Sequence, residues 1–181
     1  SGDLSTVLAA AGKLRATVED AEPAERAGLI SLRESGLQFR HPLVRAAAYQ
    51  GTTLSRRLVL HRALAGVLAR PDQADPRAWH LAAATARPDE PVALELERAA
   101  RRAADRGGRA AMASAYQRAA ELSPDPSDRG RRLALAAQAA ADAGQPERAA
   151  ALAEDAAALV TDPSLVVAVA QVRAAAADAA D

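Results

Sequence analysis

The stretch GLQFRHPLVRAAAYQG, residues 36–51, holds the side chains of this sequence that are best suited to chemistry. His41 follows an alternating run that predicts a strand, stands beside Arg40, and precedes Arg45 by one helical turn. A strand-to-helix junction directs side chains and free backbone N–H groups toward one point, which suits an anion. His41, Arg40 and Arg45 are therefore a candidate phosphate-binding group. The alternative is that His41 caps the helix and both arginines are solvated.

Other motifs that carry chemistry are missing from the sequence. It contains no GxxxxGK[ST] or GxGxxG phosphate loop, no GxSxG elbow, no HExxH pair and no cysteine. His41, His61 and His80 are far apart in the sequence and lie in different predicted elements, which argues against a metal site. We expect neither catalytic residues nor a metal, so the chain is not predicted to be an enzyme on its own.

The composition predicts an all-α protein. Alanine, the best helix former, accounts for 52 of the 181 residues, whereas aromatic residues make up only 2%. We expect more than 60% helix, in closely packed antiparallel pairs after residue 53. No apolar run is long enough to span a membrane, so we expect a cytoplasmic protein without membrane contact. The helices expected from apolar periodicity and breaker residues are 5–12, 18–27, 54–68, 109–122, 128–143, 146–160 and 163–180. Between them we expect a short helix that carries Trp79 and Leu81, and another with the apolar stripe Val92, Leu96, Ala99 and Ala103 that ends at Gly107-Gly108.

One β-hairpin is expected within residues 29–40. Leu29–Arg33 and Leu37–Arg40 alternate in polarity around Glu34-Ser35-Gly36, which is typical of a turn. Pro42 fits the first turn of the next helix. The order helix, helix, hairpin, helix resembles much of a winged-helix module. We therefore divide the sequence into a partial winged-helix-like module, residues 1–52, and a tetratricopeptide-like helical region, residues 53–181.

The helical region contains a weak internal repeat. A shift of 37 residues superposes three pairs: Asp105 on Asp142, Gly107 on Gly144, and Leu122 on Leu159. Tetratricopeptide repeats have a period of about 34 residues and two helices each, so the region is predicted to be a solenoid of helical hairpins. The last helix ends in AAAADAAD without a cap, so we expect it to continue in a longer protein.

The core of such a protein must use its few large apolar residues. The predicted core positions are Leu58, Leu96, Leu122, Leu159 and Trp79. Trp79 stands beside His80 and could line a ligand pocket. The favoured interpretation is that Trp79 fills the junction between two helical hairpins.

Charge is balanced over the chain but not along it. Residues 33–62 carry six arginines and one acid, whereas residues 141–181 carry seven acids and two arginines. A basic segment can meet the phosphates of nucleic acid or of a nucleotide, and it can also simply be solvated. Direct nucleic-acid binding through the winged-helix-like part is therefore an alternative function. Against it stand the lack of aromatic residues among the arginines and the neutral total charge.

Four stretches, in this order, resemble the large ATP-binding regulators of the LuxR family: GLQFRHPLVRAAAYQ, HRALAGVLA, RAWHLAAAT and LERAARRAADRGGRAAMASAYQRAAELSPD. In that family a P-loop ATPase leads into a winged helix, a tetratricopeptide-like region and a C-terminal helix-turn-helix. The resemblance implies that this chain holds the two middle parts and binds no cofactor itself. ATP or ADP would bind elsewhere in the longer protein, and DNA would be contacted only through its C-terminal domain.

The resemblance also implies a function. The chain would be a regulatory and protein-interaction segment that couples nucleotide state to the binding of a small-molecule inducer, a protein partner or a second copy. His41 would be directed at the phosphates of ADP in the resting state, with Arg40 or Arg45 as supporting cations. A third interpretation is an autonomous tetratricopeptide scaffold without nucleotide coupling.

Overall fold

The computed structural model describes residues 3–33 and 36–178. It is 72% helical with one two-stranded hairpin, which confirms the predicted helix content. Contacts divide the chain into two compact units, Ser1–Ala86 (unit 1) and Arg87–Asp181 (unit 2). The boundary suggested by the sequence, between residues 52 and 53, lies within unit 1.

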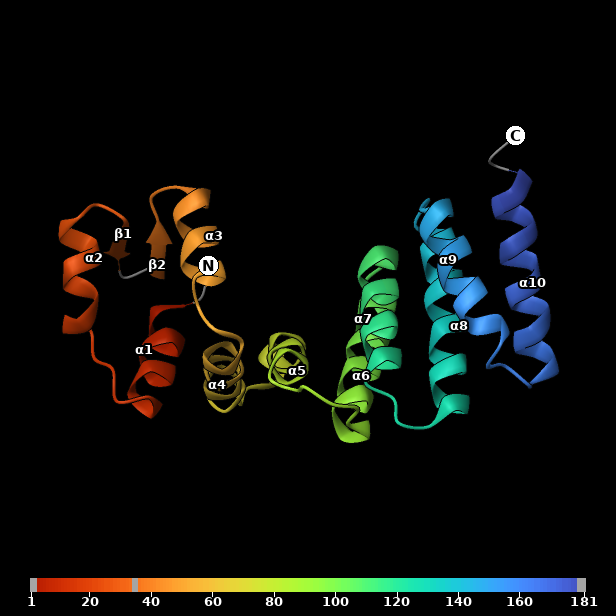
Figure 1. Ribbon diagram of the computed structural model, residues 1–181, viewed down its shortest axis with the longest axis horizontal. Helices are drawn as coiled ribbons and strands as arrows, with labels where there is room; N and C mark the ends of the chain where they lie inside the picture. Colours follow the sequence, from red (N-terminus) through yellow and green to blue (C-terminus); the bar gives the residue numbers. More distant parts are fainter. Residues whose placement is uncertain (1–2, 34–35, 179–181) are drawn as a thin grey trace. The chain divides into compact units, whose positions relative to one another are not determined.

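Unit 1 combines short helices with the hairpin. Helix α4 packs against α1 and α5, while the hairpin contacts α1, α2 and α3. Its buried side chains are almost all alanines, so the core of this unit is thin. The elements are α1 (Leu4–Lys13), η1 (Glu19–Ala21), α2 (Glu22–Arg26), β1 (Ile30–Arg33), β2 (Gly36–Phe39), α3 (Pro42–Gln50), α4 (Leu54–Ala65), η2 (Pro71–Gln73) and α5 (Ala74–Ala83) (Figure 1).

The hairpin lies within the predicted residues 29–40. Its strands are antiparallel, with the register running from Ile30 opposite Phe39 to Arg33 opposite Gly36. The backbone N–H of Arg40 extends the ladder by donating to the Leu29 carbonyl at 3.0 Å. Two residues of the predicted turn, 34 and 35, lie outside the described residues. The strands therefore deliver the chain directly to His41 and the start of α3.

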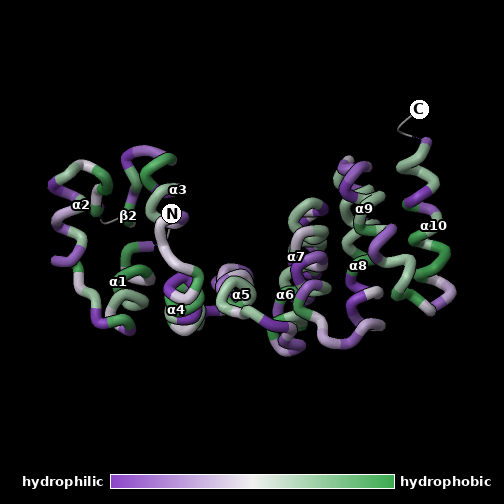
Figure 2. The backbone as a smooth tube through the Cα atoms, in the orientation of Figure 1, coloured by the Kyte–Doolittle hydropathy of each residue, from purple (hydrophilic) through white to green (hydrophobic). Residues whose placement is uncertain are grey.

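Unit 2 consists of five helices in which each packs on the next, and α10 also packs on α8. Three- to five-residue connections join them, so consecutive helices run antiparallel. Most members of its core cluster are alanines, because small side chains let helices approach closely. Figure 2 shows polar and apolar residues interspersed along these helices and a strongly apolar start of α10. The helices are α6 (Glu90–Asp105), α7 (Arg109–Glu121), α8 (Pro126–Asp142), α9 (Pro146–Ala157) and α10 (Pro163–Asp178).

Two turns of unit 2 are equivalent under the 37-residue shift. Gly107 follows the end of α6 with φ of 72°, and Gly144 follows the end of α8 with φ of 70°. In each turn the next residue donates its N–H to a carbonyl five residues back, at 2.8 Å and 3.0 Å respectively. Glycine adopts this left-handed conformation without a Cβ penalty. The repeat seen in the sequence is thus a repeat of helix ends.

Proline begins four of the helices, α3, α8, α9 and α10. Its missing N–H has no partner to lose at the first helical position. The residue before it supplies the cap in α8 and α10, because the Asp125 carboxylate accepts from Ser127 N–H at 2.8 Å and the Asp162 carboxylate from Ser164 N–H at 2.8 Å. An Asp-Pro step such as Asp162-Pro163 is a helix-start signal that can be recognised in the sequence, and α10 begins there with Asp162 as its N-cap.

The residues predicted for the core differ in burial. Leu96 and Leu122 are buried, and Leu58 and Leu159 are half-buried. The prediction that Trp79 fills the core between two helical hairpins is wrong, because 40% of its surface is exposed. Helix α5 buries the side that carries alanines 78 and 82, and Trp79 projects beside that face.

Candidate functional site

His41 is the N-cap of α3. Its backbone is extended, with φ of −142° and ψ of 142°, and Pro42 follows as the first helical residue. Nδ1 accepts a hydrogen bond from the backbone N–H of Leu43 at 3.1 Å. An acceptor at Nδ1 puts the proton of the neutral ring on Nε2. The exposed imidazole therefore keeps one N–H available for a partner.

The backbone N–H groups at the start of α3 are not free. Leu43 N–H donates to the ring, and those of Val44 and Arg45 donate to the His41 carbonyl at 3.0 and 3.4 Å. Free N–H groups were expected at this junction from the sequence, and that prediction is wrong because the three N–H groups are bonded. An anion would here be met by side chains rather than by the helix terminus.

Arg40 and Arg45 flank His41 with exposed side chains. Neither guanidinium has an ion-pair partner within the described ranges. Arg40 precedes His41 at the end of the hairpin, with its guanidinium beside Gly28, and Arg45 follows in α3. Two unpaired cations and one imidazole N–H can bind a phosphate group through charge-assisted hydrogen bonds.

A second cluster, formed by Tyr49, His61 and His80, was missed by the sequence analysis. Nδ1 of His61 lies 2.8 Å from Nδ1 of His80, although 19 residues separate them. Tyr49 Oη lies 3.4 Å from His61 Nε2, and the Arg57 guanidinium lies 5.1 Å from the centre of the Tyr49 ring. The packing of α5 on α4 brings the two histidines together. The available signal was that both lie on helices predicted to be neighbours.

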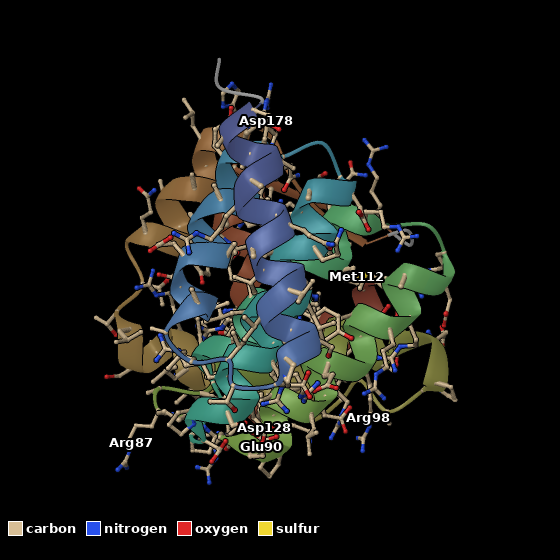
Figure 3. All side chains as sticks on the ribbon, turned by 90° about the vertical axis from the view of Figure 1, so that its right-hand side faces the viewer. Arg87, Glu90, Arg98, Met112, Asp128 and Asp178 are labelled. Carbon is tan, nitrogen blue, oxygen red and sulfur yellow. The ribbon has the colours of Figure 1, made fainter. Side chains whose placement is uncertain are left out.

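A buried ionic network joins α6 to α8 in unit 2. The side chain of Arg132 is fully buried, and its Nη atoms bind the Glu90 carboxylate at 2.9 and 2.5 Å. Its Nε donates to Glu97 at 3.0 Å, and Nη1 bonds to Ser123 Oγ at 2.5 Å. Arg131 forks onto Glu97 at 3.1 and 2.9 Å. Figure 3 shows Glu90 with Asp128, a partner of Arg131, at the same end of this unit.

The electrostatics of this network favour its charged form. Burial acts to raise the pKa of Glu97, but hydrogen bonds from Arg131 and Arg132 outweigh it and lower the pKa from 4.5 to about 2. Arg101 adds a contact to the same carboxylate at 2.6 Å. The pKa of Arg132 is raised, chiefly by its hydrogen bonds to Glu90. All charges are mutually paired, so the network holds helices together and has no position left for a ligand.

Unit 2 contains a hollow that is a further candidate site among the described residues. A hollow of about 260 Å³ lies at the junction of α8, α9 and α10, lined by Ala141, Gly144, Pro146, Ala149, Val172, Ala175 and Ala176. These side chains offer no polar group to orient a ligand. Residues 3–33 and 36–178 contain no group of three or more histidines and carboxylates placed to bind a metal ion. Of the helices described, none has the length and apolarity to cross a membrane.

No protein-family model matches the sequence, and searches of the curated proteins and of the solved structures give no significant match.

Proposed function

We propose that this chain is a non-catalytic regulatory segment of an ATP-dependent regulator of the LuxR type. In this proposal the His41 junction contacts the phosphates of ADP held by a P-loop ATPase domain. The helical pairs of unit 2 form a tetratricopeptide-like solenoid that binds a protein partner or an inducer. The observation that carries the proposal is the geometry of His41, whose Nδ1 caps α3 and whose exposed ring keeps Nε2–H available, with Arg40 before it and Arg45 after it in the chain.

The cap makes the imidazole a well-oriented donor. Because Nδ1 is held by Leu43 N–H, the ring has one tautomer and a restricted orientation. A phosphate that accepts from Nε2–H also strengthens the opposite side of the ring as an acceptor, since hydrogen bonds in a chain polarise one another. Nucleotide binding and helix capping therefore support each other at this residue.

Exposed apolar residues support the protein-interaction part of the proposal. Val166 and Val167 on α10 are 46% and 55% exposed, and Leu43 on α3 is 71% exposed. The equivalent helix ends at Gly107 and Gly144 support a repeated two-helix unit. Repeats of this kind stack helix pairs and offer extended surfaces to partners.

The test is the rate of ADP release from the protein in which this chain acts with a P-loop ATPase domain. His41→Ala removes both the cap and the donor, whereas His41→Ser keeps a side-chain cap and removes only the donor. Losing a charge-assisted contact of about 1.5–3 kcal/mol should speed ADP release by roughly 10- to 150-fold in both variants. Basal transcription of a reporter should rise with it.

Thermal melting separates the two roles of His41. His41→Ala should lose about 1 kcal/mol of stability, and His41→Ser should stay near the wild type. If His41→Ser releases ADP at the wild-type rate, the imidazole is a helix cap alone and the proposal is wrong.

Nucleic-acid binding is the second candidate, and one observation favours it. Six arginines lie between residues 33 and 62, and none has an ion-pair partner among the residues that the structure describes. Under the first proposal, duplex DNA should bind weakly and without sequence preference at physiological salt. A gel-shift assay showing sequence-specific binding that is lost in Arg45→Ala or Arg56→Ala would favour this candidate instead.

A further inference from the structure

The histidine pair on α4 and α5 has a geometry that only a shared proton satisfies. The two Nδ1 atoms are 2.8 Å apart and the ring centres 5.1 Å apart, nearly the greatest separation that this contact allows. The rings therefore point at each other end to end, with their planes inclined by 34°. A metal ion bound to both nitrogens at about 2.0–2.1 Å each would need the two Nδ1 atoms to lie farther apart, or the two rings to meet at a bend instead of end to end. The geometry is that of an N–H···N hydrogen bond.

The neutral pair places one proton in this contact, whichever tautomer His61 adopts. If Nε2 of His61 carries its proton and donates to Tyr49 Oη, Nδ1 of His80 donates to Nδ1 of His61; otherwise Nδ1 of His61 donates and its Nε2 accepts from the Tyr49 hydroxyl. A first extra proton can go to an Nε2 atom and leaves the contact intact. A second must occupy the accepting Nδ1, where two N–H groups of like charge would face each other.

Other charged groups near the pair do not relieve this conflict. Burial lowers the pKa of His61, and the fixed charge of Arg57 on α4 lowers it further. Burial and the neighbouring His61 lower the pKa of His80, and neither Asp75 nor Arg77 of α5 contributes to that shift. On the other packed elements, Lys13 of α1 binds the carbonyl at the C-terminal end of α4, and Asp72 of η2 pairs with the arginine before it. Within the part of the chain that the structure describes, no carboxylate is among the causes that shift the pKa of either ring.

We propose that His61 and His80 form a proton-operated latch that holds α5 on α4 and opens when both rings are protonated. The latch lies in unit 1, whose thin alanine core provides little other attachment for α5. It therefore gives this unit an acid-sensitive helix contact that is independent of the His41 proposal.

The direction of the pH effect follows from proton linkage. The closed pair holds protons less tightly than the open pair, so the latch is at full strength above the ordinary histidine pKa of 6.5. It weakens as the pH falls below that value. For each proton taken up on opening, the equilibrium constant for opening rises by about 10-fold when the pH falls by one unit. Opening is thus expected as the pH falls below about 6.5.

Trp79 is a built-in reporter for this motion, since it is the single tryptophan of the chain and precedes His80 on α5. The experiment follows Trp79 fluorescence and far-ultraviolet circular dichroism of the intact protein from pH 7.5 to 5. We expect a reversible shift of the emission maximum with most of the helical signal retained. The double variant His61→Gln, His80→Gln keeps hydrogen-bonding side chains that do not titrate and should show no shift. His41→Asn replaces the remaining histidine with another N-cap residue, and it should show the same pH-dependent shift of Trp79 emission as the wild type.

Nitrogen NMR of the imidazoles measures the protonation of the two Nδ1 atoms directly and needs no variant. In a pair with only a structural role, this protonation would not be coupled to the movement of α5. At pH 7.5 one Nδ1 of the pair should carry a proton and the other a lone pair, and at pH 5 both should be protonated. A flat fluorescence profile of the wild type, or a transition that persists in the double variant, would overturn the proposal. So would two histidines that titrate independently at the ordinary value.

Discussion

Replacing Arg132 with methionine is the sharpest perturbation of unit 2. Arg132 is fully buried and makes four hydrogen bonds, which tie α8 to two glutamates of α6 and to Ser123 after α7. Arg132→Met keeps a flexible, mostly apolar side chain, shorter than that of arginine, and removes the charge. Glu97 would remain bound by Arg131, whereas Glu90 would lose the guanidinium that binds both of its oxygens.

The expected cost follows from what the variant leaves behind. Removing one partner of a buried ion pair typically costs 3–5 kcal/mol, because a charge is left without compensation. Here water can reach Glu90, whose side chain is 30% exposed, so the cost should lie near the lower end, at about 3 kcal/mol. Arg131→Met is the matched control on the neighbouring residue. Its side chain is 35% exposed and it shares Glu97 with Arg132, so it should cost about 1 kcal/mol.

Urea unfolding followed by circular dichroism measures both variants. With a denaturant slope of about 2 kcal/mol/M, Arg132→Met should lower the midpoint by about 1.5 M and Arg131→Met by about 0.5 M. Fluorescence of Trp79 reports on unit 1 and should respond less than the helical signal of unit 2. Equal midpoints for the two variants, or a loss below about 1 kcal/mol in Arg132→Met, would contradict the importance assigned to the buried guanidinium.

Three further predictions test other parts of the structure. A Cβ on Gly130 would lie 2.7 Å from Leu159 Cβ, so Gly130→Ala should destabilise the protein by about 1–3 kcal/mol. A Cβ on Gly12 would have nothing within 4 Å, so Gly12→Ala should stabilise it by about 0.5–1 kcal/mol. A higher free energy of unfolding for Gly130→Ala in urea would refute the close approach to Leu159. Because the pKa of Glu97 is lowered, its contribution to the stability of unit 2 should be constant above pH 4.5 and should be lost as the pH falls toward 2, by about 3 kcal/mol in total. Acid titration of Glu97→Gln should lack this loss. Trp79→Ala should cost about 1–2 kcal/mol of stability, less than the 3–5 kcal/mol typical of a buried aromatic residue, because Trp79 is 40% exposed. A larger loss of stability in a thermal melt would mean that Trp79 packs in the core.

Local features of this fold could be predicted from the sequence. The alternation around Gly36 predicted the hairpin, and Asp162 before Pro163 predicted a helix start, because both depend on neighbouring residues. The equivalence of Gly107 and Gly144 was visible for the same reason, since a left-handed helix end selects glycine.

Features that depend on packing could not be predicted. His61 and His80 meet only because α4 and α5 contact along particular faces, and the sequence does not define the rotation of either helix. Arg132 looks like its neighbour Arg131 in the sequence, yet one is buried and the other half exposed. The state of the N–H groups after His41 was also misjudged, because the side-chain cap and the His41 carbonyl both occupy them.

In the proposed function, Nε2–H of His41 donates to a nucleotide phosphate while Nδ1 caps α3. Nitrogen NMR of the His41 imidazole tests this contact, in a protein that joins this chain to a P-loop ATPase domain. We expect ADP to shift the Nε2 resonance and Nδ1 to stay unprotonated, whereas adenosine, which has no phosphate, should leave both resonances in place. An Nε2 resonance that is unchanged by ADP, or that moves equally with adenosine, would show that His41 does not contact the phosphate.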